Sequence, residues 1–271
     1  MSGRLRFAAL GFVALAGAAA VRAVPARGRT VAVITESNGD GRNLPAPTAD
    51  RPAFFLAQSG GQHDFGELVA GEGKLAAAAV EAPLLAALAD GHYLPAPAGR
   101  APGLLVVYSW GLHAAVAPDL EDPGYGNLLD RAALVAGLKF AAELKDVLDQ
   151  NDFSVAATSQ RPWGAQMPGM RPTTPMVLLD GLSPLEAFRR RDPLTRQLLE
   201  QISDDCYYVI VAAYDYAALA RGERRLLWRT KLSMRAQGTS LDAAVPALLA
   251  RGAGFFGRAM AGPELLPGAN G

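Results

Sequence analysis

Two runs of the chain are apolar at consecutive positions, which predicts strands covered on both faces. They are LLVVYSW at 104–110 and CYYVIVAAYDY at 206–216. We expect the first of them to lie in the middle of the sheet. A third run, RTVAVIT at 29–35, is rich in β-branched residues and predicts the first strand of the mature fold.

Residues 226–235 instead alternate, which predicts a strand with one buried and one wet face. Trp228 and Leu232 fall on the core face, and Arg229 and Lys231 fall on the face toward water. The short Gly-containing connection to the preceding strand predicts an antiparallel hairpin.

Helical patterns fill most of the remaining chain, and several carry capping residues at their starts. The predicted helices are 75–89 with a kink or restart at Pro83, 127–150, two short helices that begin at Ser183 and Asp192, and a last helix from Thr239 or Ser240 through Leu249. We interpret 151–180, with its short apolar run at 176–179, as a poorly defined excursion, and the tail after Met260 as frayed.

A long loop is predicted from 36 to 73, because this stretch is dense in Gly, Pro, Asn, Asp and Gln. Loops of this length in a compact domain are commonly functional or disordered. Its aromatic residues Phe54, Phe55 and Phe65 favour an ordered loop with the three rings inserted beside the sheet.

Together these elements predict an α/β or α+β fold, with a mixed β-sheet, packed helices and a C-terminal antiparallel hairpin followed by a helix. We expect a single domain over 24–260. The order of GHYLPA, an apolar strand, YYVIVAAYD and LLWRTKLSM resembles uncharacterised bacterial secreted or envelope α/β domains over about 75–260. That resemblance implies a location and a fold, and it carries no catalytic residues.

The N-terminus has the pattern of a secretory signal peptide. Arg4 and Arg6 precede an apolar run over 7–21, which is shorter than the roughly 20 residues of a membrane span. We expect cleavage after Ala23, with Ala26 as the alternative position. No cysteine lies nearby to carry a lipid, so a secreted or periplasmic protein without a stable membrane span is expected after cleavage. The alternative is an uncleaved N-terminal anchor helix.

Charge argues against nucleic acid as a partner. Removing residues 1–23 takes away three arginines and no acid, which leaves 23 basic residues against 26 acidic ones. A nearly neutral chain has no basic field to hold phosphate backbones. The lone Cys206 cannot form an internal disulfide, so a hydrophobic core must stabilise the fold.

Within the predicted loop, Gln62, His63, Asp64 and Glu67 lie close together in sequence. An imidazole and two carboxylates can hold a divalent cation or form an acid/base pair. On a loop such residues are more commonly solvated, and one Cys with three dispersed His does not make a typical zinc site. We expect Gln62, His63 and Asp64 to be exposed at a concave rim that binds a partner.

Two more candidates follow the buried strands: His113 comes after 104–110, and Asp215 ends the second run. Ligand groups gather at the carboxyl ends of parallel strands. If these strands are parallel neighbours, His113 and Asp215 share one sheet edge. The alternative is a capping histidine and a turn aspartate.

Other known catalytic and cofactor-binding motifs are absent or lie in the wrong structural context. The GxGxxG letters at 252–257 follow a helix instead of a strand, no GxSxG elbow or phosphate loop is present, and nothing implies a cofactor. The sequence therefore favours an exported, non-catalytic protein that binds an envelope protein or a small ligand. The alternatives are a secreted hydrolase or lyase using His63, Asp64, His113 or Asp215, and an auxiliary subunit of an oligomer.

Overall fold

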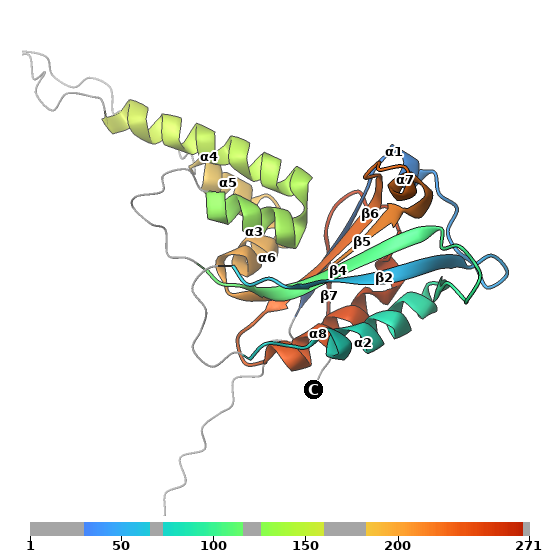
Figure 1. The fold of residues 1–271 in the computed structure, drawn as a ribbon. Coiled ribbons are helices and arrows are strands. Elements are labelled where there is room, and N and C mark those ends of the chain that lie inside the picture. The colour runs from blue at the N-terminus through green and yellow to red at the C-terminus, as the bar shows by residue number, and fades with distance from the viewer. Residues whose placement is uncertain (1–29, 66–72, 116–125, 160–182, 268–271) are drawn as a thin grey trace, which may run out of the picture.

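The computed structural model describes residues 30–65, 73–115, 126–159 and 183–267. These residues form a seven-stranded sheet in the order β3-β2-β4-β5-β6-β1-β7, with helices on both faces (Figure 1). The strands are β1 (Val31–Ser37), β2 (Ala53–Gln62), β3 (Tyr93–Pro95), β4 (Leu104–His113), β5 (Cys206–Asp215), β6 (Leu226–Arg235) and β7 (Glu264–Leu266). The predicted mixed α/β fold is confirmed.

The sheet is mixed because only β2 runs parallel to its neighbours β3 and β4. All other neighbouring strands are antiparallel. β4 lies between β2 and β5, which confirms its central position. The antiparallel pairing of β5 with β6 is confirmed too, and the short helix α7 (Tyr216–Ala220) occupies their connection.

Two hydrophobic cores lie on opposite faces of the sheet (Figure 1). The larger core contains Trp110, Trp228 and Tyr108 and is closed by α2 (Ala77–Asp90) and α8 (Leu241–Gly252). The smaller core lies under α3 (Gly126–Ala136), α4 (Leu138–Ser159), α5 (Pro184–Arg190) and α6 (Pro193–Ser203). The remaining helical turns are α1 (Gly39–Arg42) and a 3-10 turn, η1 (Ala253–Phe255).

The helix starts follow the capping residues of the sequence. The side chains of Ser183 and Asp192 accept hydrogen bonds from the backbone N–H groups of Glu186 and Thr195, and a proline opens each helix. Pro83 lies inside α2 without ending it, so the predicted restart there is wrong.

The prediction of one helix over 127–150 is wrong, because two helices meet at Gly137. Its φ of 91° lies in the left-handed region, which a glycine adopts without the steric cost of a Cβ. α4 then continues to Ser159, into the stretch predicted to be an excursion. The apolar run at 176–179 lies outside the described residues.

The predicted long loop over 36–73 contains a ten-residue strand, β2, so that prediction is wrong. Hydrogen bonds to β4 along one side hold β2 in the sheet despite its polar and glycine-rich second half. Phe55 is buried as predicted, and Phe54 is half-buried under the guanidinium of Arg100, 3.9 Å from the ring centre. Phe65 is 51% exposed, so its predicted insertion is wrong.

On β6, Trp228 and Leu232 are buried as predicted. The prediction that the opposite face of this strand is exposed to water is wrong. Lys231 is only 4% exposed because α3 packs over this face of β6. Its Nζ donates to the carbonyl of Ala133 and lies 3.0 Å from the carboxylate of Glu36. Strands in the interior of a sheet bury both faces when helices cover both.

The chain after Met260 does not fray over its whole length. Glu264–Leu266 form β7, an edge strand paired with β1. Residues 1–29, which hold the predicted signal peptide, lie outside the described residues. Over the described ranges, no helix has the length and apolar character needed to cross a membrane.

Candidate functional site

The residues predicted to form a rim take part in structural hydrogen bonds where β2 leaves the sheet. Asp64 accepts from the backbone N–H of Leu112 and from the Gln62 side chain, both at 2.8 Å. Gln62 in turn accepts from the backbone N–H of Leu75 at 2.7 Å. Gln62 and Asp64 are half-buried, and only His63 of the three is exposed. This arrangement anchors the end of β2 to β4 and to the start of α2.

His113 and Asp215 do not share a sheet edge, because β4 and β5 are antiparallel. His113 pairs with Cys206 at one end of the strands, and Asp215 pairs with Leu104 at the other. Ten residues of strand put these ends about 30 Å apart. The condition of parallel neighbours is therefore not met.

Each of the two residues has a local environment of its own. His113 is 5% exposed, and burial lowers its pKa. Its ring packs against that of Phe65 at 5.3 Å. Asp215 accepts from the backbone N–H of Ala218 and so begins α7, which is the predicted turn alternative. Glu67 lies outside the described residues.

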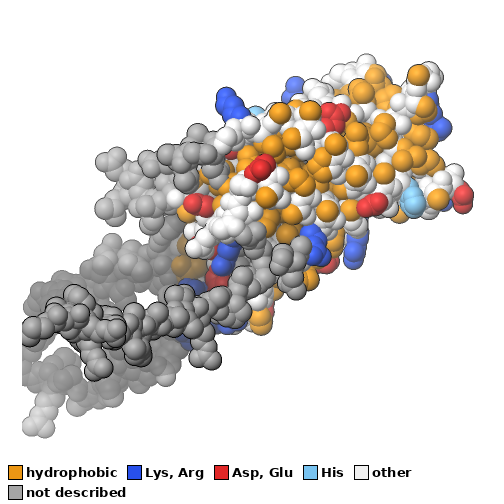
Figure 2. All heavy atoms as spheres, turned by 90° about the horizontal axis from the view of Figure 1, so that it is seen from below, with side chains coloured by type: hydrophobic (Ala, Val, Ile, Leu, Met, Phe, Trp, Pro, Cys, Tyr) orange, Lys and Arg blue, Asp and Glu red, His pale blue; other side chains and the backbone are white. Residues whose placement is uncertain are grey.

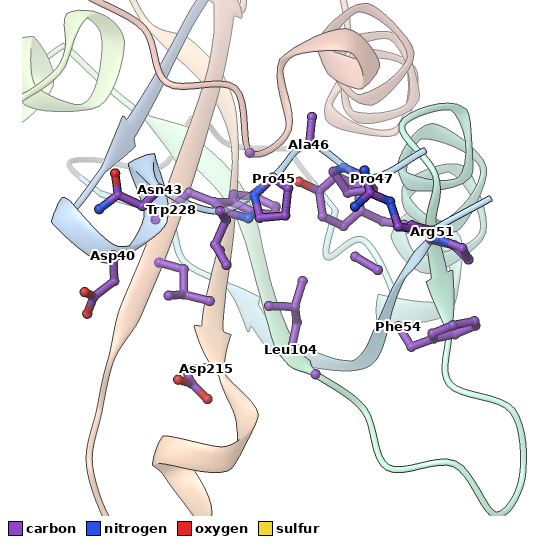
Figure 3. A pocket seen from close by; sticks show the side chains of 18 of the residues that line it. Asp40, Asn43, Pro45, Ala46, Pro47, Arg51, Phe54, Leu104, Asp215 and Trp228 are labelled. Atoms are coloured by element: carbon purple, nitrogen blue, oxygen red, sulfur yellow. The ribbon is translucent and has the colours of Figure 1, made fainter. Parts of the chain in front are cut away.

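A pocket of about 970 Å³ opens at the sheet end that contains Asp215 (Figure 3). Its walls come from the chain after β1, the starts of β2, β3, β4 and β6, and the turn after η1. In Figure 3, Asp40 and Asp215 lie on one side, and Arg51 and Phe54 lie on the other, with Leu104 between them. The volume is at the upper end of the range for small-molecule sites.

The floor of this pocket is formed by two buried aromatic residues that each carry a hydrogen-bond donor. Tyr93 is 5% exposed and Trp228 is 1% exposed, and their rings meet edge to face at 5.6 Å. The Tyr93 hydroxyl and the Trp228 indole N–H have no hydrogen-bond partner among the described residues, and neither of these two atoms is fully buried. Burial raises the pKa of Tyr93 to about 12, so its hydroxyl stays protonated and can donate at neutral pH.

Gly257 packs closely against these two groups. A Cβ at this position would overlap the Tyr93 hydroxyl and lie 3.2 Å from Nε1 of Trp228. Its φ of 71° is one that residues with a Cβ rarely adopt. Glycine is therefore the residue that fits beside the two groups at this position, and Tyr93, Trp228 and Gly257 all line the pocket.

The charges that line the pocket are five arginines and two aspartates. Both aspartates lie near one arginine: Arg225 is 3.8 Å from Asp40 and 3.9 Å from Asp215. Arg42 and Arg51, by contrast, have no carboxylate within 4.0 Å among the described residues.

Arg100 completes this group of exposed cations. Its guanidinium lies over the Phe54 ring and, within the described part of the chain, also lacks a carboxylate partner. The three guanidinium groups of Arg42, Arg51 and Arg100 are named here the arginine rim. They leave the mouth of the pocket positive.

The pocket lining combines these charged side chains with apolar ones. No His, Cys, Ser, Thr or Lys is among the described residues that line it. Prolines and the side chains of Leu44, Leu104 and Leu227 give it apolar walls. The described residues also contain no group of three or more His, Cys, Asp and Glu placed to hold a metal ion.

No sequence pattern predicts this pocket, because its lining residues come from seven separate segments. The region of 36–73 was expected to carry function, and its first half, from Asp40 to Phe54, does line the pocket. Neither the model of a known protein family nor a characterised protein matches the chain.

Proposed function

We propose that this chain is an exported, non-catalytic protein that binds a small organic anion with an apolar body in the pocket. The observation that carries the proposal is the arginine rim above a floor with two unpartnered donors. Guanidinium groups match carboxylate and phosphate oxygens in geometry and charge. The apolar walls suit the rest of such a ligand.

The N-terminal sequence pattern alone supports the export part of this proposal. The lining of the pocket supports the class of ligand. A carboxylate or phosphate would bind at the arginine rim, and its carbonyl or hydroxyl oxygens would accept hydrogen bonds from Tyr93 and Trp228. The ligand would relieve the repulsion among Arg42, Arg51 and Arg100.

Isothermal titration calorimetry with octanoate and phenyl phosphate tests the ligand class. Octanol and phenol are the matched neutral probes. We expect the anions to bind, the neutral probes to bind more weakly, and the affinity to fall as salt screens the arginine rim.

Variants locate the binding. Arg51→Ala and Arg100→Ala should each weaken anion binding about tenfold or more, since a charge-assisted hydrogen bond contributes about 1.5 to 3 kcal/mol. Tyr93→Phe removes only a hydroxyl from the floor and should weaken binding without unfolding the protein. Arg251→Ala, an exposed arginine on α8 outside the pocket, is the control. If the three pocket variants bind the anions as tightly as the wild type and the Arg251→Ala control do, the pocket is not the site.

A further inference from the structure

β2 has an outer edge that β3 covers only in part. β3 pairs with Ala53, Phe54 and Phe55 and then leaves the sheet. The backbone of Ala53 donates to His92, and that of Phe55 accepts from Ala96, so these two residues face the β3 side. Strand alternation turns the backbone groups of Ala57 and Ser59 the same way.

Among the described residues, no backbone group pairs with Ala57 or Ser59 on this side. Gln58 and Ser59 are exposed, and Ala57 is half-buried. This short segment, Ala57–Ser59, is named here the free edge. Unpaired edges usually carry charges or proline, because they otherwise pair with another strand. Residues 53–62 contain neither.

The sheet face beside the free edge is apolar and lies outside both cores. Leu56 is 50% exposed, and its neighbours on β4, Leu105 and Val107, are half-buried. None of the three belongs to either core cluster. Of the helices α3 to α6, α3 contacts β1 and β6 instead. An added strand would extend this face.

We propose that the free edge pairs with the free edge of a second copy of this chain, so that two sheets join antiparallel about a two-fold axis at Gln58. The absence of charge favours this occupant, because the same segment meets itself without like-charge repulsion. The geometry is self-matching as well: Ala57 of one copy meets Ser59 of the other, and each such pair exchanges two backbone hydrogen bonds. The register irregularity between Ser59 and Gly61 confines the pairing to this segment.

Gln58 gives a sharp test, because its side chain would face its own copy across the axis. Gln58→Lys and Gln58→Glu each place like charges opposite one another, and each should weaken dimerisation about tenfold or more. An equimolar mixture of the two variants should restore the dimer, since opposite charges then face each other. Sedimentation velocity over a wide concentration range measures dimerisation of the full-length wild type, of each Gln58 variant and of their mixture. Circular dichroism checks that the variants are folded.

A second apolar surface serves as the control. The outer sides of α2 and α8 are rich in alanine, and hydrophobic side chains dominate this side of the molecule (Figure 2). Ala82 is exposed on α2, so Ala82→Arg should leave a β2-mediated dimer intact. A wild-type monomer at every concentration overturns the proposal. The proposal is also wrong if Ala82→Arg dissociates the dimer and the Gln58 variants do not. It is equally wrong if the two Gln58 variants fail to associate when they are mixed.

Discussion

Replacing Glu36 by alanine tests the buried ion cluster on β1 and β6, where sequence periodicity placed Lys231 in water. The Glu36 carboxylate lies 2.9 Å from Arg229 and 3.0 Å from Lys231, and it accepts from the backbone N–H of Leu138 at 2.7 Å. Without this carboxylate, the ammonium of Lys231 retains only the carbonyl of Ala133 as a described partner.

The expected loss is large because the charge left behind is 4% exposed. Removing one partner of a buried ion pair costs about 3 to 5 kcal/mol. The Glu36 side chain is itself 23% exposed, so we expect a loss in unfolding free energy of about 3 kcal/mol. The matched surface pair, Glu143 with Arg191, has side chains 38% and 48% exposed. Glu143→Ala should cost about 0 to 1 kcal/mol.

Urea unfolding followed by circular dichroism at pH 7 measures these losses. The double variant Glu36→Ala/Lys231→Met should recover most of the loss, because an apolar residue then replaces the stranded charge. A loss below about 1 kcal/mol for Glu36→Ala, or a double variant no more stable than the single one, would refute the reasoning.

The dependence on pH gives an independent check. Burial opposes the charged form of Glu36, but the Leu138 N–H, Lys231 and Arg229 together lower its pKa below the ordinary 4.5. A carboxyl with a lowered pKa stabilises the folded state fully above its unfolded value, and the stabilisation disappears as pH falls through the folded value. Wild-type stability should therefore fall below about pH 4.5, and the Glu36→Gln variant should lack this part of the decrease.

Three further predictions concern packing, the end of β2 and export. Trp228→Ala should lower the unfolding free energy by about 3 to 5 kcal/mol. Arg229→Ala should lower it by about 1 to 3 kcal/mol, because this residue bonds to Glu36; equal losses for the two would contradict the packing. Asp64→Ala should cost about 1 to 3 kcal/mol through two lost hydrogen bonds, and His63→Ala should stay within about 0.5 kcal/mol, both measured by urea unfolding. N-terminal sequencing of the protein from a fractionated host should find cleavage after Ala23, and a cytosolic chain that starts at Met1 would disprove export.

The sequence by itself determined those helices and strands that have a clear local pattern, such as a continuous apolar run or a capping residue. The apolar runs predicted β4 and β5, and the capping residues Ser183 and Asp192 predicted the starts of α5 and α6. β2 escaped prediction because a strand that continues through Ser59, Gly60 and Gly61 has no hydrophobic period. Its hydrogen bonds to β4 hold it in the sheet, and those bonds join residues about fifty positions apart.

Tertiary structure alone decided what surrounds each side chain. The alternation over residues 226–235 puts Lys231 on the polar face of its strand. α3 nevertheless covers Lys231, because the smaller core lies over that part of the sheet. His113 and Asp215 each end a strand, and only the antiparallel pairing of β4 with β5 puts them at opposite ends. The arginine rim has no spacing that a sequence pattern could detect, since Arg100 joins the other two only through the fold. Side-chain periodicity reports which residues of one element share a face, whereas burial and the composition of a site depend on which elements pack together.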